Sequence, residues 1–530
     1  MTPRGAAGLL AAALAASFAL PLALGHPYWQ TVDDPFFAMI VHGFGVAEAP
    51  NPGTFYLAVL YGKLLGAIGT LEGVRAYDAM TYALLAAAGA ASAWALWRAG
   101  ASAALAAAAL LVVFAPAALY PQYTVLAGLL AVAGLLVLST GSGRAAAILA
   151  CALLIAAGMV RAAEVVLAAA VTAPLWLPAL ARGWPARGWA IGALACAMLA
   201  LLASAVVDRA FYAAPEWRQF MDMQPARLLF TDYGLRQYLM GDPLHAMRLG
   251  FVPNDLVMVE GWFFSDPRVF PPARLLELTQ FVSVPAWWWS NVQRLSEFAT
   301  PFADESFLAP LLFAVYALWR ARARSGWWAM AAFGALRLAL LVLGRPNTVR
   351  IYIPLLAGIL FFALAARPAP AGKLDSPLAA ALVVALVVAL GVRNAADRAA
   401  ELAQRDWACR LPPERLYVVW ADTLPYAKLY PPFGPPRGSC PLRLYPLAVH
   451  SYAPYALEVL RRATGSGDVV GALLAGREIN LIGNDWQVDV LRRHLRIHYG
   501  AELQWLAQDS DDDRNRVRWY RLSLAPQAKR

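Results

Sequence analysis

The hydrophobic positions of this chain form long uninterrupted blocks instead of the spacing of three to four residues that marks one buried helix face. A helix needs roughly 20 consecutive apolar residues to cross the hydrocarbon of a bilayer. Such runs recur along the sequence, and Ala and Leu dominate them. We predict an α-helical polytopic membrane protein with spans near 6–25, 77–97, 101–119, 122–140, 145–160, 162–180, 189–208, 305–319, 327–343, 350–366 and 377–392. The first run also has the features of a cleaved signal peptide, because Arg4 precedes its apolar core.

Polar residues gather in three segments, 26–76, 209–304 and 393–530. The last segment alternates strand-like and helix-like patterns, which predicts a small α/β domain. Its strand-like runs are Leu416–Trp420, Ile479–Ile482, Glu502–Leu506 and Val517–Leu522, and its helix-like runs are 453–463 and 485–498. We therefore divide the chain into a transmembrane domain, 1–392, and a C-terminal domain, 393–530.

Residues 55–71 decide the predicted topology. This run is apolar but short, and Lys63 lies near its middle, so it fits a helix lying in the membrane interface. With that assignment, most basic residues of the short loops fall on one side, which the positive-inside rule places in the cytoplasm. They are Arg4, Arg98, Arg144, Arg182, Arg187, Arg320, Arg322, Arg324, Arg367 and Lys373. We expect a multi-pass protein of a bacterial inner membrane, with a cytoplasmic N-terminus and a periplasmic C-terminal domain.

Composition agrees with this class. Of the 530 residues 60% are hydrophobic and 15% are charged, against about 25% charged in an average soluble protein. The net charge of +10 is spread over short loops, so it does not indicate a nucleic-acid partner. The chain has no nucleotide-binding phosphate loop, so any reaction must draw its energy from an activated, membrane-accessible substrate.

The four cysteines are too few for a disulfide framework. Cys151 and Cys196 lie in predicted spans and suit packing. Cys409 and Cys440 lie in the predicted periplasmic domain, where a disulfide between them is possible. We find no Cys-x-x-Cys pair and expect no zinc site and no certain cofactor, although a need for a divalent metal stays open.

Two adjacent acids, Asp33 and Asp34, follow the first predicted span and precede Pro35. In one interpretation, an acid caps a helix that starts at Pro35. In the other, a carboxylate at the membrane surface acts as a general base or orients a nucleophile. His42 lies on the same predicted helix and is a weaker candidate for substrate contact.

The order of segments carries a resemblance. After the acidic pair, Asn51-Pro52-Gly53-Thr54-Phe55-Tyr56-Leu57 leads into the interfacial helix, and Glu72-Gly73-Val74-Arg75-Ala76 leads into the next span. This arrangement resembles the N-terminal part of the GT-C glycosyltransferases, such as lipid A aminoarabinose transferases and protein O-mannosyltransferases. The resemblance implies a GT-C-like fold with a catalytic acid at Asp33 or Asp34, of which Asp33 is the better match. The family motif is commonly Asp-Glu, whereas here it is Asp-Asp-Pro.

The run Arg345–Pro354 resembles the segment of such enzymes that lies beside the lipid-linked phosphate. The resemblance implies phosphate contacts from Arg345, Arg350 and Tyr352, and a guanidinium suits a phosphate diester because it binds two oxygens at once. The alternative is that both arginines extend to lipid headgroups. Lys63, Asp255 and Glu260 are weaker candidates for substrate binding.

The expected function is transfer of a sugar from a polyprenyl-phosphate donor to a hydroxyl of a glycan, lipid or protein acceptor on the periplasmic side. Two other classes remain open. A transporter or flippase of lipid-linked sugars needs polar groups at mid-membrane depth, where Arg337 is the main example. A non-catalytic scaffold of the same fold needs neither outer acid.

Overall fold

A bundle of long helices makes up most of the computed structural model, which describes residues 2–71, 73–182, 187–241, 243–293, 295–322, 324–345, 348–366, 375–435, 440–510 and 517–525. Glu72, Pro346, Asn347, Arg367 and Lys373 of the predicted motifs and loops therefore lie outside the described residues. The bundle helices are α1 (Pro3–Leu24), α4 (Ala76–Arg98), α5 (Ala103–Leu119), α6 (Tyr123–Thr140), α7 (Arg144–Arg182), α8 (Arg187–Tyr212), α15 (Glu305–Ala321), α16 (Arg324–Val342), α17 (Val349–Ala366) and α18 (Asp375–Ala408).

Every predicted span falls in one of these helices, with at most two of its residues outside the helix. Eight helices of the described chain are long and apolar enough to cross a membrane, or nine if η3 (Leu295–Ala303) and α15, which meet at 87°, count as one span. The prediction of about eleven is higher for two reasons. Helix α5 has only 17 residues, and α7 contains two of the predicted spans.

Helix α7 breaks at Arg161, which has an extended backbone (φ −164°, ψ 102°). Both halves pack against α6. Ala150 and Leu154 of the first half lie beside Gly134, whereas Glu164 of the second half lies near Gly128. The two halves are therefore separate segments that meet at Arg161, as the sequence pattern predicts.

The outward faces of several bundle helices are apolar. Ile191, Leu199 and Val206 on α8 and Val384 and Val388 on α18 are all more than half exposed, whereas α6 and α17 are buried in the centre. Such exposure is unfavourable in water, and it suits a helix that faces lipid. The bundle thus has the surface of a membrane domain.

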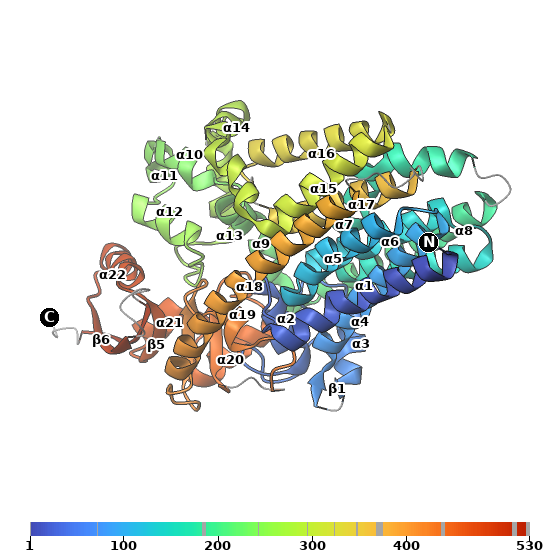
Figure 1. The fold of residues 1–530 in the computed structure, drawn as a ribbon. Helices are drawn as coiled ribbons and strands as arrows, with labels where there is room; N and C mark the ends of the chain where they lie inside the picture. The colour runs from blue at the N-terminus through green and yellow to red at the C-terminus, as the bar shows by residue number, and fades with distance from the viewer. Residues whose placement is uncertain are drawn as a thin grey trace.

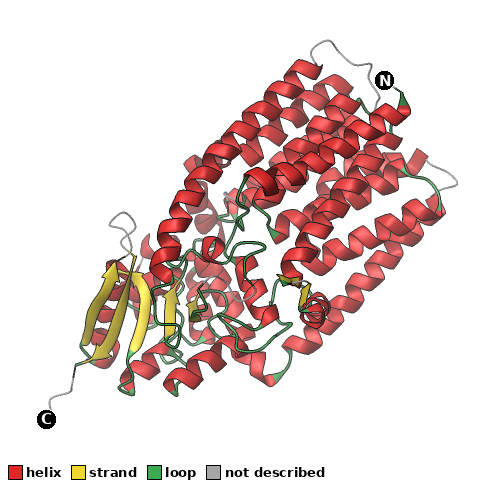
Figure 2. Cartoon of the chain, turned by 60° about the horizontal axis from the view of Figure 1, so that its bottom comes forward, coloured by secondary structure: helices red, strands yellow, loops and turns green. Residues whose placement is uncertain are grey.

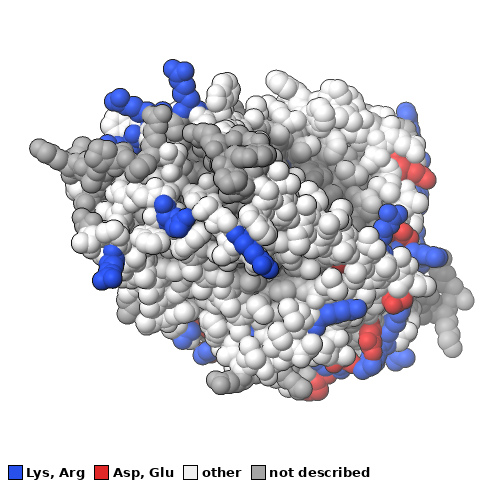
Figure 3. Space-filling view, turned by 90° about the vertical axis from the view of Figure 1, so that its right-hand side faces the viewer, with Lys and Arg blue, Asp and Glu red and all other residues white. Residues whose placement is uncertain are grey.

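The two ends of the bundle differ in charge. One end carries the exposed residues Arg4, Arg98, Arg144, Arg322 and Arg324. Figure 3 shows Lys and Arg side chains scattered over this end, with Asp and Glu gathered toward one edge. This distribution agrees with the predicted arginine-rich loops, and by the positive-inside rule we expect this end in the cytoplasm.

The other end carries short helices from the first two polar segments. Helix α2 (Asp33–His42) is followed by α3 (Val59–Ile68), which is too short to span, and by the strands β1 (Thr70–Leu71) and β2 (Val74–Arg75). The second segment forms η1 (Pro215–Trp217), α9 (Arg218–Thr231), α10 (Leu235–Gly241), α11 (Pro243–Arg248), α12 (Pro253–Glu260), α13 (Pro272–Glu277), η2 (Leu278–Phe281) and α14 (Val284–Val292). Figure 1 shows these helices and the C-terminal domain at the end away from the N-terminus.

The C-terminal domain is built on a five-stranded mixed sheet of order β4-β3-β5-β7-β6 (Figure 2). Its elements are β3 (Leu416–Trp420), α19 (Tyr426–Leu429), β4 (Arg443–Leu447), α20 (Pro454–Thr464), α21 (Val469–Leu474), β5 (Ile479–Asn484), α22 (Asp485–Tyr499), β6 (Leu503–Ser510) and β7 (Val517–Leu524). Strands β4, β3 and β5 are parallel, and β7 and β6 add antiparallel pairs.

Helix α18 continues past the predicted end of its span, residue 392, to Ala408, and so leads directly into this domain. A disulfide joins Cys409, at the end of α18, to Cys440, just before β4.

One apolar core unites the outer parts of the chain. It includes Phe36 and Ile40 of α2, Phe263 after α12, and Trp420 and Tyr445 of the sheet. Because side chains from three distant segments share this core, the short helices of the first two polar segments and the C-terminal domain pack as one layer over the end of the bundle, which we call the outer layer.

Candidate active site

A cavity of about 700 Å³ lies between the end of the bundle and the outer layer. Asp33 of α2, Tyr123 of α6, Arg161 at the break of α7 and Arg350 of α17 form the wall on the bundle side. The C-terminal domain contributes the loops after β3 and β4, at Ala421, Asp422, Ala448, Val449 and His450. Ligands commonly bind at the carboxyl ends of adjacent parallel strands. In this domain the carboxyl ends of β3 and β4 are the part of the sheet that borders the cavity.

Three residues of the cavity wall have a strained backbone. Phe55, Trp262 and Ala421 have φ values of 70°, 69° and 55°, the left-handed region that non-glycine residues rarely adopt. They are three of the five such residues in the described chain. A strained backbone persists only where the surrounding packing holds it in place, and such residues are concentrated at functional sites.

Asp33 is the first residue of α2 and faces the cavity. Its Oδ2 lies 3.5 Å from Nη1 of Arg350, and its side chain is 17% exposed. Burial raises the pKa of Asp33 above its ordinary value of 3.8, while the positive charges of Arg350 and Arg161 oppose that rise. A partly buried carboxyl with a raised pKa is the kind of group that accepts a proton during catalysis.

Asp34 has a different role. It is fully buried, and its Oδ1 accepts hydrogen bonds from Tyr77 Oη (2.7 Å) and the Tyr123 backbone N (3.0 Å). Its Oδ2 accepts from Thr31 Oγ1 (3.2 Å). Burial raises the pKa of Asp34 to about 8. Asp34 therefore ties α2 to the first residues of α4 and α6.

The capping interpretation needs correction. Helix α2 begins at Asp33, not at Pro35, and its N-cap is Val32, which makes no side-chain capping bond. Both acids instead occupy the first turn, where the positive end of the helix dipole favours negative charge.

Besides Arg227, three arginines line the cavity, together with the carboxyl groups of Asp33, Asp232 and Asp422. Arg350 faces Asp33, and Arg345 Nη2 lies 3.4 Å from Asp232 Oδ2. Arg161 donates to Tyr123 Oη (2.6 Å) and Thr124 Oγ1 (3.2 Å), and it forms an ion pair with Glu164 (3.4 Å). A second cavity of about 390 Å³ adjoins the first and shares Thr31, Thr231, Asp232, Arg345 and Arg350 with it.

Arg227 and His450 also line the cavity, and neither was a predicted site residue. Both side chains are almost fully buried, at 2% and 1% exposure. Arg227 donates through Nη1 to the Val449 carbonyl, while its Nε and Nη2 have no hydrogen-bond partner. Burial lowers the pKa of Arg227 to about 10 and that of His450 to about 3. Nε2 of His450 likewise has no partner, so both residues have bonding capacity left for a ligand.

Six predicted site residues, including the buried Asp34, do not line either cavity. Tyr352 is fully buried against Phe307 and Phe333, and Lys63 is exposed on α3. His42 accepts from the Tyr77 backbone N (3.3 Å), and Glu260 pairs with Arg236 (2.8 Å). Asp255 is buried beside His494 and His498. His494 and His498 form a His-x-x-x-His spacing on α22, which was overlooked when no zinc site was expected from the sequence.

Neither a protein-family model nor a curated protein sequence matches the chain. Among solved structures, the crystal structure of ArnT from Cupriavidus metallidurans in the apo state is similar. The similarity covers 97% of both chains at 15% sequence identity, with a TM-score of 0.40. This degree of likeness is too low to transfer an activity, so the function must be argued from the cavity itself.

Proposed function

We propose that the protein is a glycosyltransferase that moves a sugar from a polyprenyl-phosphate donor to an acceptor hydroxyl on the periplasmic side of the inner membrane. One observation carries this proposal. A carboxyl group suited to be a general base, Asp33, shares a cavity at the end of the membrane bundle with Arg161, Arg345 and Arg350. The resemblance of the acidic segment to GT-C enzymes supports the same reaction class.

Asp33 is the proposed base. In the reaction, its carboxylate takes the proton of the acceptor hydroxyl while the hydroxyl oxygen attacks the anomeric carbon of the sugar. The bond between that carbon and the phosphate oxygen breaks, and its electron pair leaves with the polyprenyl phosphate. A single direct displacement of this kind inverts the configuration of the anomeric carbon.

Arg345 and Arg350 are the proposed phosphate contacts, with Arg161 added on the basis of its place in the cavity wall. The leaving phosphate gains negative charge as the bond breaks, and fixed positive charges in a secluded site stabilise that change. The side chains of Arg345 and Arg350 remain 22% and 27% exposed, so a phosphate can reach them. The adjoining cavity is also lined by both arginines and is the proposed donor entrance.

The C-terminal domain would hold the acceptor. His450 stands in the loop after β4, and Arg227 is bonded to that loop through the Val449 carbonyl. Their free nitrogen atoms suit hydroxyl or anionic groups of an acceptor.

The test uses the full-length protein in proteoliposomes with a panel of polyprenyl-monophosphate sugars and membrane-extract acceptors. Mass spectrometry follows released polyprenyl phosphate and glycosylated product. Asp33→Asn should lower turnover by about a hundredfold to ten-thousandfold while donor binding survives. Arg350→Ala should weaken donor binding as well as turnover, because its proposed partner is the phosphate. An Asp33→Asn variant that is correctly inserted and fully active would refute the assignment.

The same assay separates the other two classes. A flippase would move lipid-linked sugar without forming product, and it would do so in Asp33→Asn too. The structure supports transport less well, because Arg337 donates to the Phe298 carbonyl (2.7 Å) and lies over the Phe298 ring (4.1 Å). A scaffold would keep its cellular role in both variants.

A further inference from the structure

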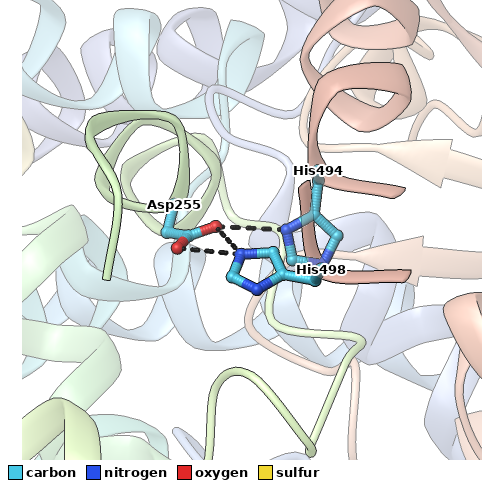
Figure 4. Close-up of side chains that lie close together, drawn as sticks. All are labelled: Asp255, His494 and His498. Atoms are coloured by element: carbon cyan, nitrogen blue, oxygen red, sulfur yellow. Dashed lines mark hydrogen bonds and ion pairs between the residues drawn. The ribbon is translucent and has the colours of Figure 1, made fainter. Parts of the chain in front are cut away.

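Two histidines of the C-terminal domain face an aspartate of the second polar segment (Figure 4), and none of the three lines the cavity. His494 and His498 lie one turn apart on α22, and Asp255 lies in the first turn of α12. Asp255 Oδ1 is 3.2 Å from His494 Nδ1 and 2.9 Å from His498 Nε2. Asp255 and His494 are fully buried, and the His498 side chain is 17% exposed.

We propose that Asp255, His494 and His498 bind a divalent transition-metal ion of the zinc type, which fastens α22 to α12. Two imidazole nitrogens and one carboxylate oxygen are a donor set that zinc accepts. The three ligand atoms already lie within 4.8 Å of one another. Ligands about 2.0–2.2 Å from a tetrahedral ion stand roughly 3.3 Å apart, so small side-chain movements are sufficient. The fourth position goes to water, which the partial exposure of His498 allows.

The surroundings of His494 support a ligand role. Its second nitrogen, Nε2, lies 2.9 Å from Asp266 Oδ2. Asp266 is held in turn by Tyr499 Oη, at 2.8 and 2.9 Å, and by Arg268 Nε at 3.0 Å. A carboxylate that accepts from the far nitrogen of a histidine fixes the ring and directs the other lone pair to a metal. Here that other nitrogen, Nδ1, faces Asp255.

The competing explanation is a hydrogen-bonded cluster without metal. In that arrangement the ring nitrogens of His494 share protons with Asp255 and Asp266, which lie on either side of it. His498 must donate to Asp255 at the same time. The two explanations therefore differ in what lies between His494 Nδ1, His498 Nε2 and Asp255, which is either protons or a metal ion.

The role of the ion would be structural. Helix α12 leads to Gly261, whose carbonyl accepts from Trp420 Nε1 (2.6 Å), and then to Trp262 in the cavity wall. An ion bridging α12 and α22 would hold this part of the wall against the C-terminal domain. The inference goes beyond the proposed function and does not depend on it, since none of the three ligands lines the cavity.

The experiment measures Zn²⁺ binding to the full-length protein in detergent after chelator treatment. Elemental mass spectrometry should find about one tightly bound Zn²⁺ per chain, and the unfolding temperature should rise with free Zn²⁺. His498→Gln keeps an N–H for Asp255 but lacks the imidazole, so its Zn²⁺ affinity should fall at least tenfold. Addition of Zn²⁺ should then no longer raise the unfolding temperature of this variant. His26→Gln removes an exposed histidine elsewhere on the outer side and should behave as wild type.

A second measurement needs no variant. Zn²⁺ should protect His498 of the wild-type protein from diethylpyrocarbonate, while the exposed His26 reacts equally with and without it. Wild-type protein that binds no Zn²⁺, or His498→Gln that binds it equally well, would mean a hydrogen-bonded cluster only and overturn the proposal. Failure of His498→Gln to fold leaves the decision to the protection experiment.

Discussion

The contrast between two substitutions of Asp34 tests the assignment of the acidic pair most directly. Asp34→Ala removes the acceptor of two buried donors, the Tyr77 hydroxyl and the Tyr123 backbone N–H. Each stranded donor costs about 1–3 kcal/mol, so the free energy of unfolding should fall by roughly 2–6 kcal/mol. Asp34→Asn should cost far less, because the same oxygen, Oδ1, accepts both bonds and an amide retains it.

The charge of Asp34 gives a pH dependence with a definite sign. The pKa of Asp34 is raised from 3.8 to about 8 in the folded protein. Between about pH 4 and pH 8 the carboxyl group is therefore protonated in the folded state and ionised in the unfolded state. This contribution to stability is present at low pH and is lost as the pH rises from about 4 to 8. The amide of Asp34→Asn cannot ionise, so the stability of this variant should not show this decrease between about pH 4 and pH 8.

Thermal unfolding in detergent, followed by the fluorescence of the 19 tryptophans, measures both effects. Asp33→Asn and Asp33→Ala are the matched controls. Asp33 makes one 3.5 Å ion pair and is partly exposed, so both changes should leave the unfolding temperature nearly unchanged while turnover is lost. A stable Asp34→Ala protein would refute the tethering role. A stable but inactive Asp34→Asn protein would transfer the chemistry from Asp33 to Asp34.

Four further results are expected. Turnover should rise with pH as Asp33 loses its proton, with a midpoint above 3.8; Arg350→Gln removes a charge that opposes the raised pKa and should move the midpoint higher. Arg227→Gln should raise the KM for acceptor and leave donor binding unchanged, because Arg227 lines the cavity beside the loop proposed to hold the acceptor and two of its nitrogens have no partner. Reduction of the disulfide that links Cys409 to Cys440 should lower the free energy of unfolding by about 3 kcal/mol in the chain-entropy picture. Cys196 is a free thiol, so the Cys196→Ser variant is the control and should lose the same stability on reduction. A cysteine placed at Ser523 should react with an impermeant thiol reagent in intact spheroplasts; labelling only after lysis would reverse the topology.

The transmembrane part was predictable because the signal is local. Crossing a bilayer demands a long apolar run whatever the neighbouring helices do, so each predicted span falls in a helix with at most two of its residues outside it. The same holds for four strands of the C-terminal domain, whose apolar runs stand between turn residues. Strand β4 was missed because Pro446 lies within it. A proline is tolerated there because β4 is an edge strand, and that place in the sheet is a tertiary property.

The composition of the cavity wall could be predicted from the sequence much less well than the transmembrane helices, because it depends on tertiary packing. The sequence singled out Asp33, Asp34, Arg345 and Arg350, but it left open which acid works in the site. Successive residues on a helix point about 100° apart, and only the packing of α2 against α4 and α6 turns Asp34 inward and Asp33 toward Arg350. No sequence pattern marks Arg227 or His450 as site residues. They are candidates only because the folded structure places them in the cavity wall with ring or guanidinium nitrogens that have no hydrogen-bond partner. The pattern of apolar runs thus defined the membrane protein, whereas contacts between residues hundreds of positions apart decided where its chemistry can occur.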